Sequence, residues 1–131
     1  MTEIAYALLR IVAGLMFAFN GVQKLFGLWL GEQKQPEIGS LFWFGGIIEL
    51  VCGIAIAFGL LTRWAAFLAS GTMAVAYIKF HWMFAVDKNF FPTINEGELA
   101  LLYAFVFLFI ACRGGGWWSA DAHLRRSRQS V

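Results

Sequence analysis

The chain has 131 residues, of which 60% are hydrophobic and only 14% are charged, and its mean hydropathy is +0.70. A soluble domain of this size needs more polar surface, so the composition predicts one membrane domain over residues 1–131. The formal net charge of +2, with no basic stripe interleaved with aromatic residues, argues against nucleic acid as a partner.

The first predicted membrane span covers residues 4–26. No basic segment precedes its apolar run, so we expect a retained span and not a cleaved signal peptide. Five residues recur at alternating four- and three-residue steps, which places them on one helical stripe that should face other helices. We expect Arg10 and Asn20 to be polar residues with a structural role. The stripe consists of Arg10, Gly14, Phe17, Gly21 and Lys24.

The second predicted span covers residues 41–61 and follows a loop over residues 27–40 that contains glycine, proline and mixed charges. Gly45 and Gly53 stand four residues on either side of its one carboxylate, Glu49, so small residues and an acid are predicted to share a face. A carboxylate at this depth costs about 2.5 to 3.5 kcal/mol and is usually kept where a partner or water receives it. The alternative partners are Arg10, Lys24, Lys79 and His81.

The third predicted span covers residues 64–84. Only Thr62 and Arg63 separate it from the second span, so these two spans should form an antiparallel hairpin, with Thr62 capping a helix that begins at Arg63. Tyr77 and His81 lie one turn apart and are expected to share a face.

The fourth predicted span covers residues 96–113. Pro92 should end the preceding helix, and Asn95 followed by Glu98 fits a capping box at the start of the new one. A glycine triplet ends the fourth span. The basic tail over residues 114–131 is expected to be cytoplasmic and to form a short interfacial helix.

Tryptophan and arginine indicate the topology. Indole prefers the headgroup level, and all six tryptophans fall at expected span ends. Most arginines fall on one expected side, whereas Lys34 and Lys88 fall on the other, so the arginine-rich side and both termini should be cytoplasmic. The tryptophans are Trp29, Trp43, Trp64, Trp82, Trp117 and Trp118, and the arginines are Arg63, Arg113, Arg125, Arg126 and Arg128.

Five stretches occur in an order that resembles a known family. They are LLRIVAGLMFAFNGVQKLFG, GGIIELVCGIAIAFGLLTRWAAF, MAVAYIKFH, FFPTINEGELALLYAF and GGGWWSADAHL. Together they resemble the DoxX family of small four-span bacterial membrane proteins. The resemblance implies an all-α, four-helix transmembrane bundle in the bacterial inner membrane. It also implies a link to thiosulfate:quinone oxidoreductase, in which a related small membrane subunit is thought to pass electrons to the quinone pool.

Two functional classes fit this pattern best, and transport of protons or small solutes is a weaker third, because four short spans without internal duplication give little room for alternating access. The first is a membrane subunit of an oxidoreductase system that handles quinone or a similar lipid-soluble carrier and works with a soluble or membrane redox partner protein. The second is a non-catalytic membrane adaptor or assembly factor. Whether the chain is itself an enzyme stays open, and no catalytic residue is assigned. We expect membrane lipids as partners. The small-residue stripes would also accommodate a second copy of the chain in a homodimer.

A ligand site is predicted in the half of the bundle away from the arginines. A quinone headgroup presents carbonyl acceptors and takes up protons on reduction, so it needs donors and a titratable group. The sequence has neither a metal-spaced cluster nor a Ser/His/Asp arrangement, so we expect no metal site. The candidate ligand-binding residues are Lys24, Glu49, Tyr77, Lys79, His81, Asn95 and Glu98.

Overall fold

The structure, a computed structural model, describes residues 1–28, 31 and 34–131. Within this part of the chain all regular structure is helical, which confirms the predicted all-α class. Two helices, α1 and α2, are long and apolar enough to cross a bilayer. Trp29 lies outside the described residues. The elements are α1 (Thr2–Phe26), α2 (Leu41–Phe58), α3 (Thr62–Ala76), the π-helical turn η1 (Tyr77–Trp82), the 3₁₀ turn η2 (Lys88–Phe90), α4 (Glu98–Arg113) and α5 (Ala120–Gln129).

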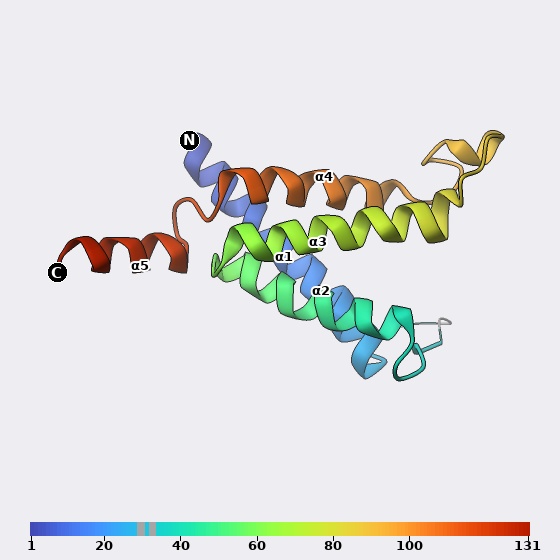
Figure 1. Cartoon of the computed structure of the whole chain (residues 1–131), viewed down its shortest axis with the longest axis horizontal. Coiled ribbons are helices and arrows are strands. Elements are labelled where there is room, and N and C mark those ends of the chain that lie inside the picture. The colour runs from blue at the N-terminus through green and yellow to red at the C-terminus, as the bar shows by residue number, and fades with distance from the viewer. Residues whose placement is uncertain (29–30, 32–33) are drawn as a thin grey trace.

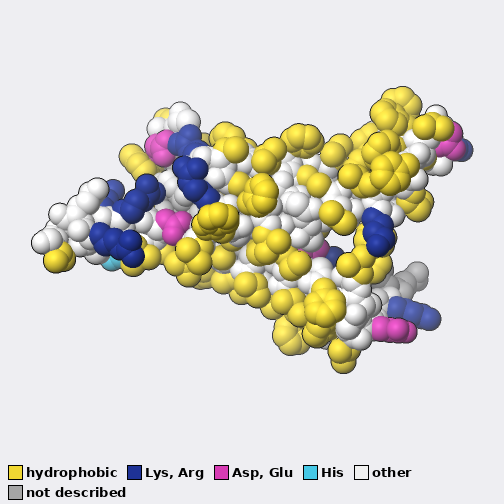
Figure 2. Space-filling model, viewed as in Figure 1, with side chains coloured by type: hydrophobic (Ala, Val, Ile, Leu, Met, Phe, Trp, Pro, Cys, Tyr) yellow, Lys and Arg dark blue, Asp and Glu magenta, His cyan; other side chains and the backbone are white. Residues whose placement is uncertain are grey.

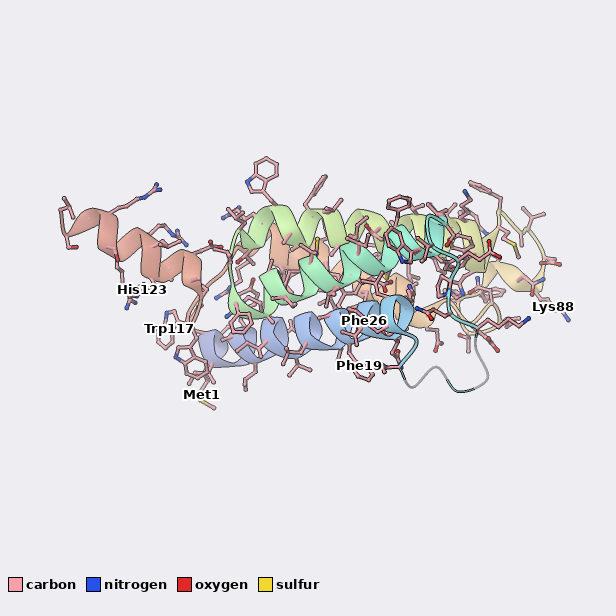
Figure 3. The ribbon with its side chains drawn as sticks, turned by 90° about the horizontal axis from the view of Figure 1, so that it is seen from below. Met1, Phe19, Phe26, Lys88, Trp117 and His123 are labelled. Atoms are coloured by element: carbon pink, nitrogen blue, oxygen red, sulfur yellow. The ribbon has the colours of Figure 1, made fainter. Side chains whose placement is uncertain are left out.

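Helices α1, α2, α3 and α4 form the body of the molecule, and α5 extends beyond one end of it (Figure 1). Helix α1 pairs with α2, and α3 pairs with α4, while α2 also contacts α3. Both chain termini lie toward the end from which α5 extends. The view in Figure 3 agrees, with Met1 and Trp117 near that end and Lys88 at the opposite one. Successive helices therefore run in alternating directions.

Glycines bring α1 and α2 into backbone contact. A Cβ atom on Gly14 would lie 2.6 Å from the Ala57 nitrogen, and one on Gly53 would lie 2.4 Å from the Ala18 nitrogen. Arg10, Gly14, Phe17 and Gly21 are all buried, so this part of the predicted stripe on the first helix does face the protein. Close backbone approach of this kind is how helices associate in lipid.

The small residues that flank Glu49 on its α1-facing side are not the predicted pair. Gly53 does meet α1, but no atom of the described residues lies within 4 Å of a Cβ built on Gly45. Gly46 takes its place, since a Cβ there would lie 3.0 Å from the Lys24 Cβ. The face that packs on α1 therefore runs through positions three before and four after the acid, and Gly45 is turned toward α3.

The cap of α3 comes from the tail and not from Thr62. The helix begins at Thr62, one residue earlier than predicted, because Leu61 adopts a left-handed conformation with φ 47°. The Asp121 carboxylate accepts from the Leu61 and Thr62 backbone nitrogens, both at 2.9 Å, and from Thr62 Oγ1 at 2.7 Å. Thr62 is thus a donor within the first turn, and its predicted capping role is wrong.

The predicted capping box at the start of the fourth span is also absent. Helix α4 begins at Glu98 with Gly97 as its N-cap, so Asn95 lies two residues too early to cap it. Asn95 Oδ1 instead accepts from the Gly97 nitrogen at 2.9 Å, which stabilises the turn before the helix.

The tail is helical as expected, but α5 does not lie across the end of the bundle. It extends away from that end, roughly along the long axis of the molecule (Figures 1 and 3). Ser119 caps it, with Oγ accepting from the Ala122 nitrogen at 3.2 Å. The Asp121 nitrogen donates to the Gly59 carbonyl at 2.9 Å. These contacts hold the first turn of α5 against the link between α2 and α3, and so they set its direction.

Candidate functional site

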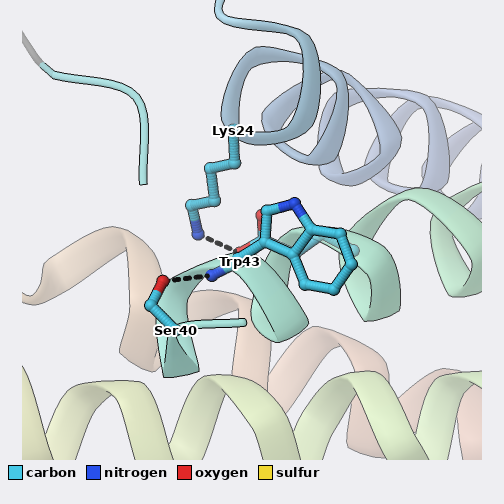
Figure 4. Close-up of polar contacts among 4 residues, drawn as sticks. Lys24, Ser40 and Trp43 are labelled. Carbon is cyan, nitrogen blue, oxygen red and sulfur yellow. Dashed lines mark hydrogen bonds and ion pairs between the residues drawn. The ribbon is translucent and has the colours of Figure 1, made fainter. Parts of the chain in front are cut away.

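Glu49 pairs with Lys24. The Lys24 Nζ lies 2.6 Å from Glu49 Oε1, so α1 and α2 are joined by an ion pair as well as by glycine contacts (Figure 4). The Glu49 side chain is only 3% exposed, whereas that of Lys24 is 29% exposed. Of the partners that the sequence left open, the structure selects Lys24.

Local structure explains how the pair forms. Ser40 Oγ accepts from the Trp43 nitrogen at 3.2 Å and so fixes the start of α2 (Figure 4). Glu49 follows two helical turns later. The absence of a side chain on Gly46 leaves room for the Lys24 stem to cross α2, which lets the ammonium group reach the carboxylate.

The pair lies at the wall of a cavity between α2 and α3 with a volume of about 410 Å³. Figure 2 shows the surface hollowed between the two helix pairs, on the side away from α5. Gly45 and Gly71 both line this groove, and a Cβ added to either would meet no atom of the described chain within 4 Å. Apart from Lys24, Glu49 and Thr72 its side chains are apolar. They include Phe42, Phe44, Ile48, Phe67, Met73 and Phe80.

One carboxylate oxygen of the ion pair makes no hydrogen bond within the described chain. Glu49 Oε2 is buried and has no hydrogen-bond partner among the described residues, and the same is true of the Tyr103 hydroxyl on α4. The Tyr103 ring packs against Phe17 and Phe107, with centroid separations of 5.6 and 5.3 Å. Buried polar groups without partners are uncommon and often mark function.

Sequence reasoning missed Tyr103. A single tyrosine in the run LALLYAFVFLFIAC looks like any aromatic residue of an apolar core. Its one distinguishing feature is that it carries the only hydroxyl in that run.

Tyr77, His81 and Asn95 form a second, separate cluster. The rings of Tyr77 and His81 are stacked with centroids 6.5 Å apart, and Asn95 Nδ2 donates to the Tyr77 hydroxyl at 3.4 Å. The Nδ1 atom of His81 lies 3.2 Å from the Asn95 carbonyl. This cluster holds the turn before α4 against η1, and none of its three residues lines the groove.

The remaining predicted site residues stand apart from both clusters. Lys79 and Glu98 are exposed. Asn20 is half-buried and lines a different recess, together with Leu99 and Tyr103. The structure thus divides the predicted ligand site, and Lys24 and Glu49 are its only members that line the groove.

Arg10 joins three segments at the other end of the bundle. Its buried Nη1 donates to the Ile56 and Ala57 carbonyls, both at 2.7 Å, and Nη2 donates to the Trp118 carbonyl at 2.8 Å. A cation at the C-terminal end of α2 also complements the helix dipole. Arg10 therefore does not pair with Glu49.

A bundle of apolar helices with a buried ion pair defines the chain as an all-helical membrane protein. The family model of DoxX matches residues 5–82, so the chain belongs to the DoxX family, as its sequence motifs predicted. No solved structure matches the chain.

Two relatives support this assignment. An uncharacterized protein of Haemophilus influenzae is 38% identical over 117 residues, which cover 88% of this chain and 87% of that protein. An uncharacterized membrane protein of Mycobacterium tuberculosis is 28% identical over 130 residues, which cover 90% of this chain and 80% of that protein.

Proposed function

We propose that the protein is the membrane subunit of an oxidoreductase system and that the groove between α2 and α3 binds a quinone or a similar lipid-soluble carrier. One observation carries this proposal. The groove is apolar over most of its wall and meets a single ion pair, in which one carboxylate oxygen has no partner in the described chain.

The groove suits an amphipathic ligand. Its volume of about 410 Å³ falls in the range of ligand sites, about 300 to 1,000 Å³. The Lys24 ammonium can donate to a headgroup carbonyl, and the phenylalanine side chains can pack on the ring and the apolar tail. Phe44, Phe67 and Val75 line the groove and are also exposed on the outer surface, so a carrier could enter directly from the hydrocarbon.

Proton supply is the second requirement. Reduction of a quinone to a quinol adds two electrons and two protons. The electrons would come from the soluble or membrane redox partner protein, and Glu49 is the carboxyl group placed to hold a proton inside the groove. Lys24 is partly exposed near the end of α1, so protons could pass from water along Lys24 to Glu49.

The proposal places the protein in the bacterial inner membrane with both termini in the cytoplasm. Basic side chains gather around the end that carries α5 (Figure 2), among them Arg63, Arg125 and Arg128, and the positive-inside rule assigns that end to the cytoplasm. The Lys24 and Glu49 pair then lies in the outer half of the bundle. A homodimer stays a prediction. Gly14, Gly21 and Gly53, which were expected to accommodate a second copy, pack α1 against α2 within one chain.

Binding of a short-chain quinone analogue to the purified protein tests this function. Lys24→Met should weaken binding by about ten- to a hundredfold, since a hydrogen bond from a charged donor is worth about 1.5 to 3 kcal/mol. Lys79→Met is the matched control, because it removes the same charge from an exposed lysine outside the groove.

Failure of the parent protein to bind any analogue below its solubility limit would reject the quinone site. A protein that purifies without lipid-soluble carrier but with one protein partner would support the adaptor function instead.

A further inference from the structure

A second cavity, of about 350 Å³, lies at the end of the bundle that carries α5. It is formed by the start of α3, the glycines after α4 and one side of α5. The charged residues in its wall are Arg63, Arg125, Arg128 and Asp121. This cavity shares no residue with the groove near Glu49, so what it binds is independent of the proposed quinone site.

The cavity has an excess of positive charge. Three guanidinium groups face one carboxylate, and both oxygens of that carboxylate already accept hydrogen bonds from Leu61 and Thr62. Burial alone would raise the pKa of the Asp121 carboxyl, but the hydrogen bonds from Thr62 and Leu61, with Arg125 nearby, hold it below its ordinary value. Asp121 is therefore ionised at neutral pH and is occupied in capping α3.

The arginines are available to an external anion. Among the described residues, the hydrogen bond of Arg63 is a long one, from Nη2 to the Arg113 carbonyl at 3.5 Å. Within the described residues, Arg125 and Arg128 form no ion pair. Guanidinium groups bind phosphate oxygens in bidentate geometry, which makes an oxyanion with several oxygens the matching ligand.

The apolar part of the wall indicates what carries that anion. Trp64 is 76% exposed and Leu61 is 65% exposed, and with Leu124 they border the cavity. Tryptophan marks the headgroup level of a membrane, so the arginines lie where headgroups lie and the apolar side chains continue toward the hydrocarbon. A ligand of this shape has a phosphate at one end and an acyl chain at the other.

We propose that this cavity binds the phosphodiester headgroup of an anionic phospholipid. Arg63, Arg125 and Arg128 hold the phosphate, and the first acyl carbons lie along Leu61 and Trp64. Basic pockets beside membrane helices recognise such headgroups in this way. The bound lipid joins α5 to the start of α3 and helps to hold the tail in place.

Lipid binding by the full chain in detergent tests the proposal. Native mass spectrometry should show phosphatidylglycerol retained about a hundredfold more than phosphatidylcholine with the same acyl chains, since each of the three arginines near anionic lipid contributes about fivefold. Arg125→Gln with Arg128→Gln should reduce this preference to about fivefold, the contribution of the remaining Arg63. The control is Arg126→Gln with Lys88→Gln, which removes the same charge from residues outside the cavity and should keep the preference.

Three results would overturn the proposal. Equal retention of the two lipids by the parent protein would exclude charge recognition. Equal loss in the control pair would show a general effect of net charge. Displacement of phosphatidylglycerol by millimolar inorganic phosphate would show that the cavity is a site for free phosphate and not for a lipid.

Discussion

The two members of the buried ion pair are not equivalent. Glu49 is 3% exposed and lies in the middle of α2, whereas Lys24 is 29% exposed and lies in the last turn of α1. A lysine in that position can swing its flexible stem and bring its ammonium group to water. The Glu49 carboxylate cannot reach water in this way. Loss of the partner should therefore cost more free energy at Glu49 than at Lys24.

This asymmetry predicts the order of two variants. Lys24→Met should lower the thermal unfolding temperature in detergent more than Glu49→Gln, because leaving a buried charge without its partner costs about 3 to 5 kcal/mol. Thermal scans of both variants measure the difference, with Lys79→Met expected to match the parent. A larger loss for Glu49→Gln would show that Lys24 is the buried member.

Asp121 provides a second prediction at the level of single residues. Asp121→Ala should destabilise the protein by about 0.5 to 2 kcal/mol, the usual value of an N-cap, because it removes all three bonds to Leu61 and Thr62. Asp87→Ala is the control, since Asp87 caps only the short turn η2. Equal effects of the two substitutions would argue against a cap on α3.

The pH dependence of this contribution has a defined sign. Because the pKa of Asp121 is lowered in the folded protein, its stabilisation is complete above the unfolded value of about 3.9 and is lost as pH falls through the folded value. The difference in unfolding temperature between parent and Asp121→Ala should therefore be constant above about pH 5 and narrow below about pH 4.

At the scale of helices, the α1 and α2 pair depends on the contact between Gly53 and the α1 backbone. Gly53→Ala should lower stability by about 1 to 3 kcal/mol, because its Cβ would lie 2.4 Å from a backbone atom that cannot move alone. Gly71→Ala is the matched control, as that Cβ meets open space. Unfolding in detergent compares them, and equal stability would contradict this packing.

Local sequence predicted the helices well and their caps poorly. Hydropathy and glycine spacing act within one helix, so the α1 stripe and the rough extents of α1 and α2 could be read directly. The cap of α3 could not, because Asp121 lies 59 residues from Thr62 in the chain. Nothing within the sequence near Thr62 reveals that partner.

The candidate site was predicted in part for the same reason. Lys24 and Glu49 could be recognised as charges within apolar spans, but choosing between Lys24 and His81 required the packing of α1 on α2. Tyr77 and His81 do share a face, as their spacing indicated, yet that face meets Asn95 and not the groove. Tyr103 has no charge and stands in an apolar run, so no signal in the sequence indicates that its hydroxyl is a buried polar group.

For the whole molecule, the alternating helix directions place both termini at the arginine-rich end. A reporter fused after Val131 should therefore be active only as a cytoplasmic reporter, and one inserted near Lys34 only as a periplasmic one. Paired fusions of a cytoplasmic and a periplasmic reporter measure this. The reverse pattern would mean that the protein has the opposite orientation in the membrane, with the Glu49 and Lys24 pair in the cytoplasmic half.

Photolabelling decides whether the groove between α2 and α3 binds a quinone. A photoreactive short-chain quinone analogue should label peptides from α2 and α3, within residues 41–58 and 62–76, and excess unlabelled quinone should remove the label. Lys24→Met should reduce labelling, whereas Lys79→Met should not. Label that concentrates instead on Tyr77, His81 and Asn95, or that resists competition, would contradict a carrier site in the groove between α2 and α3.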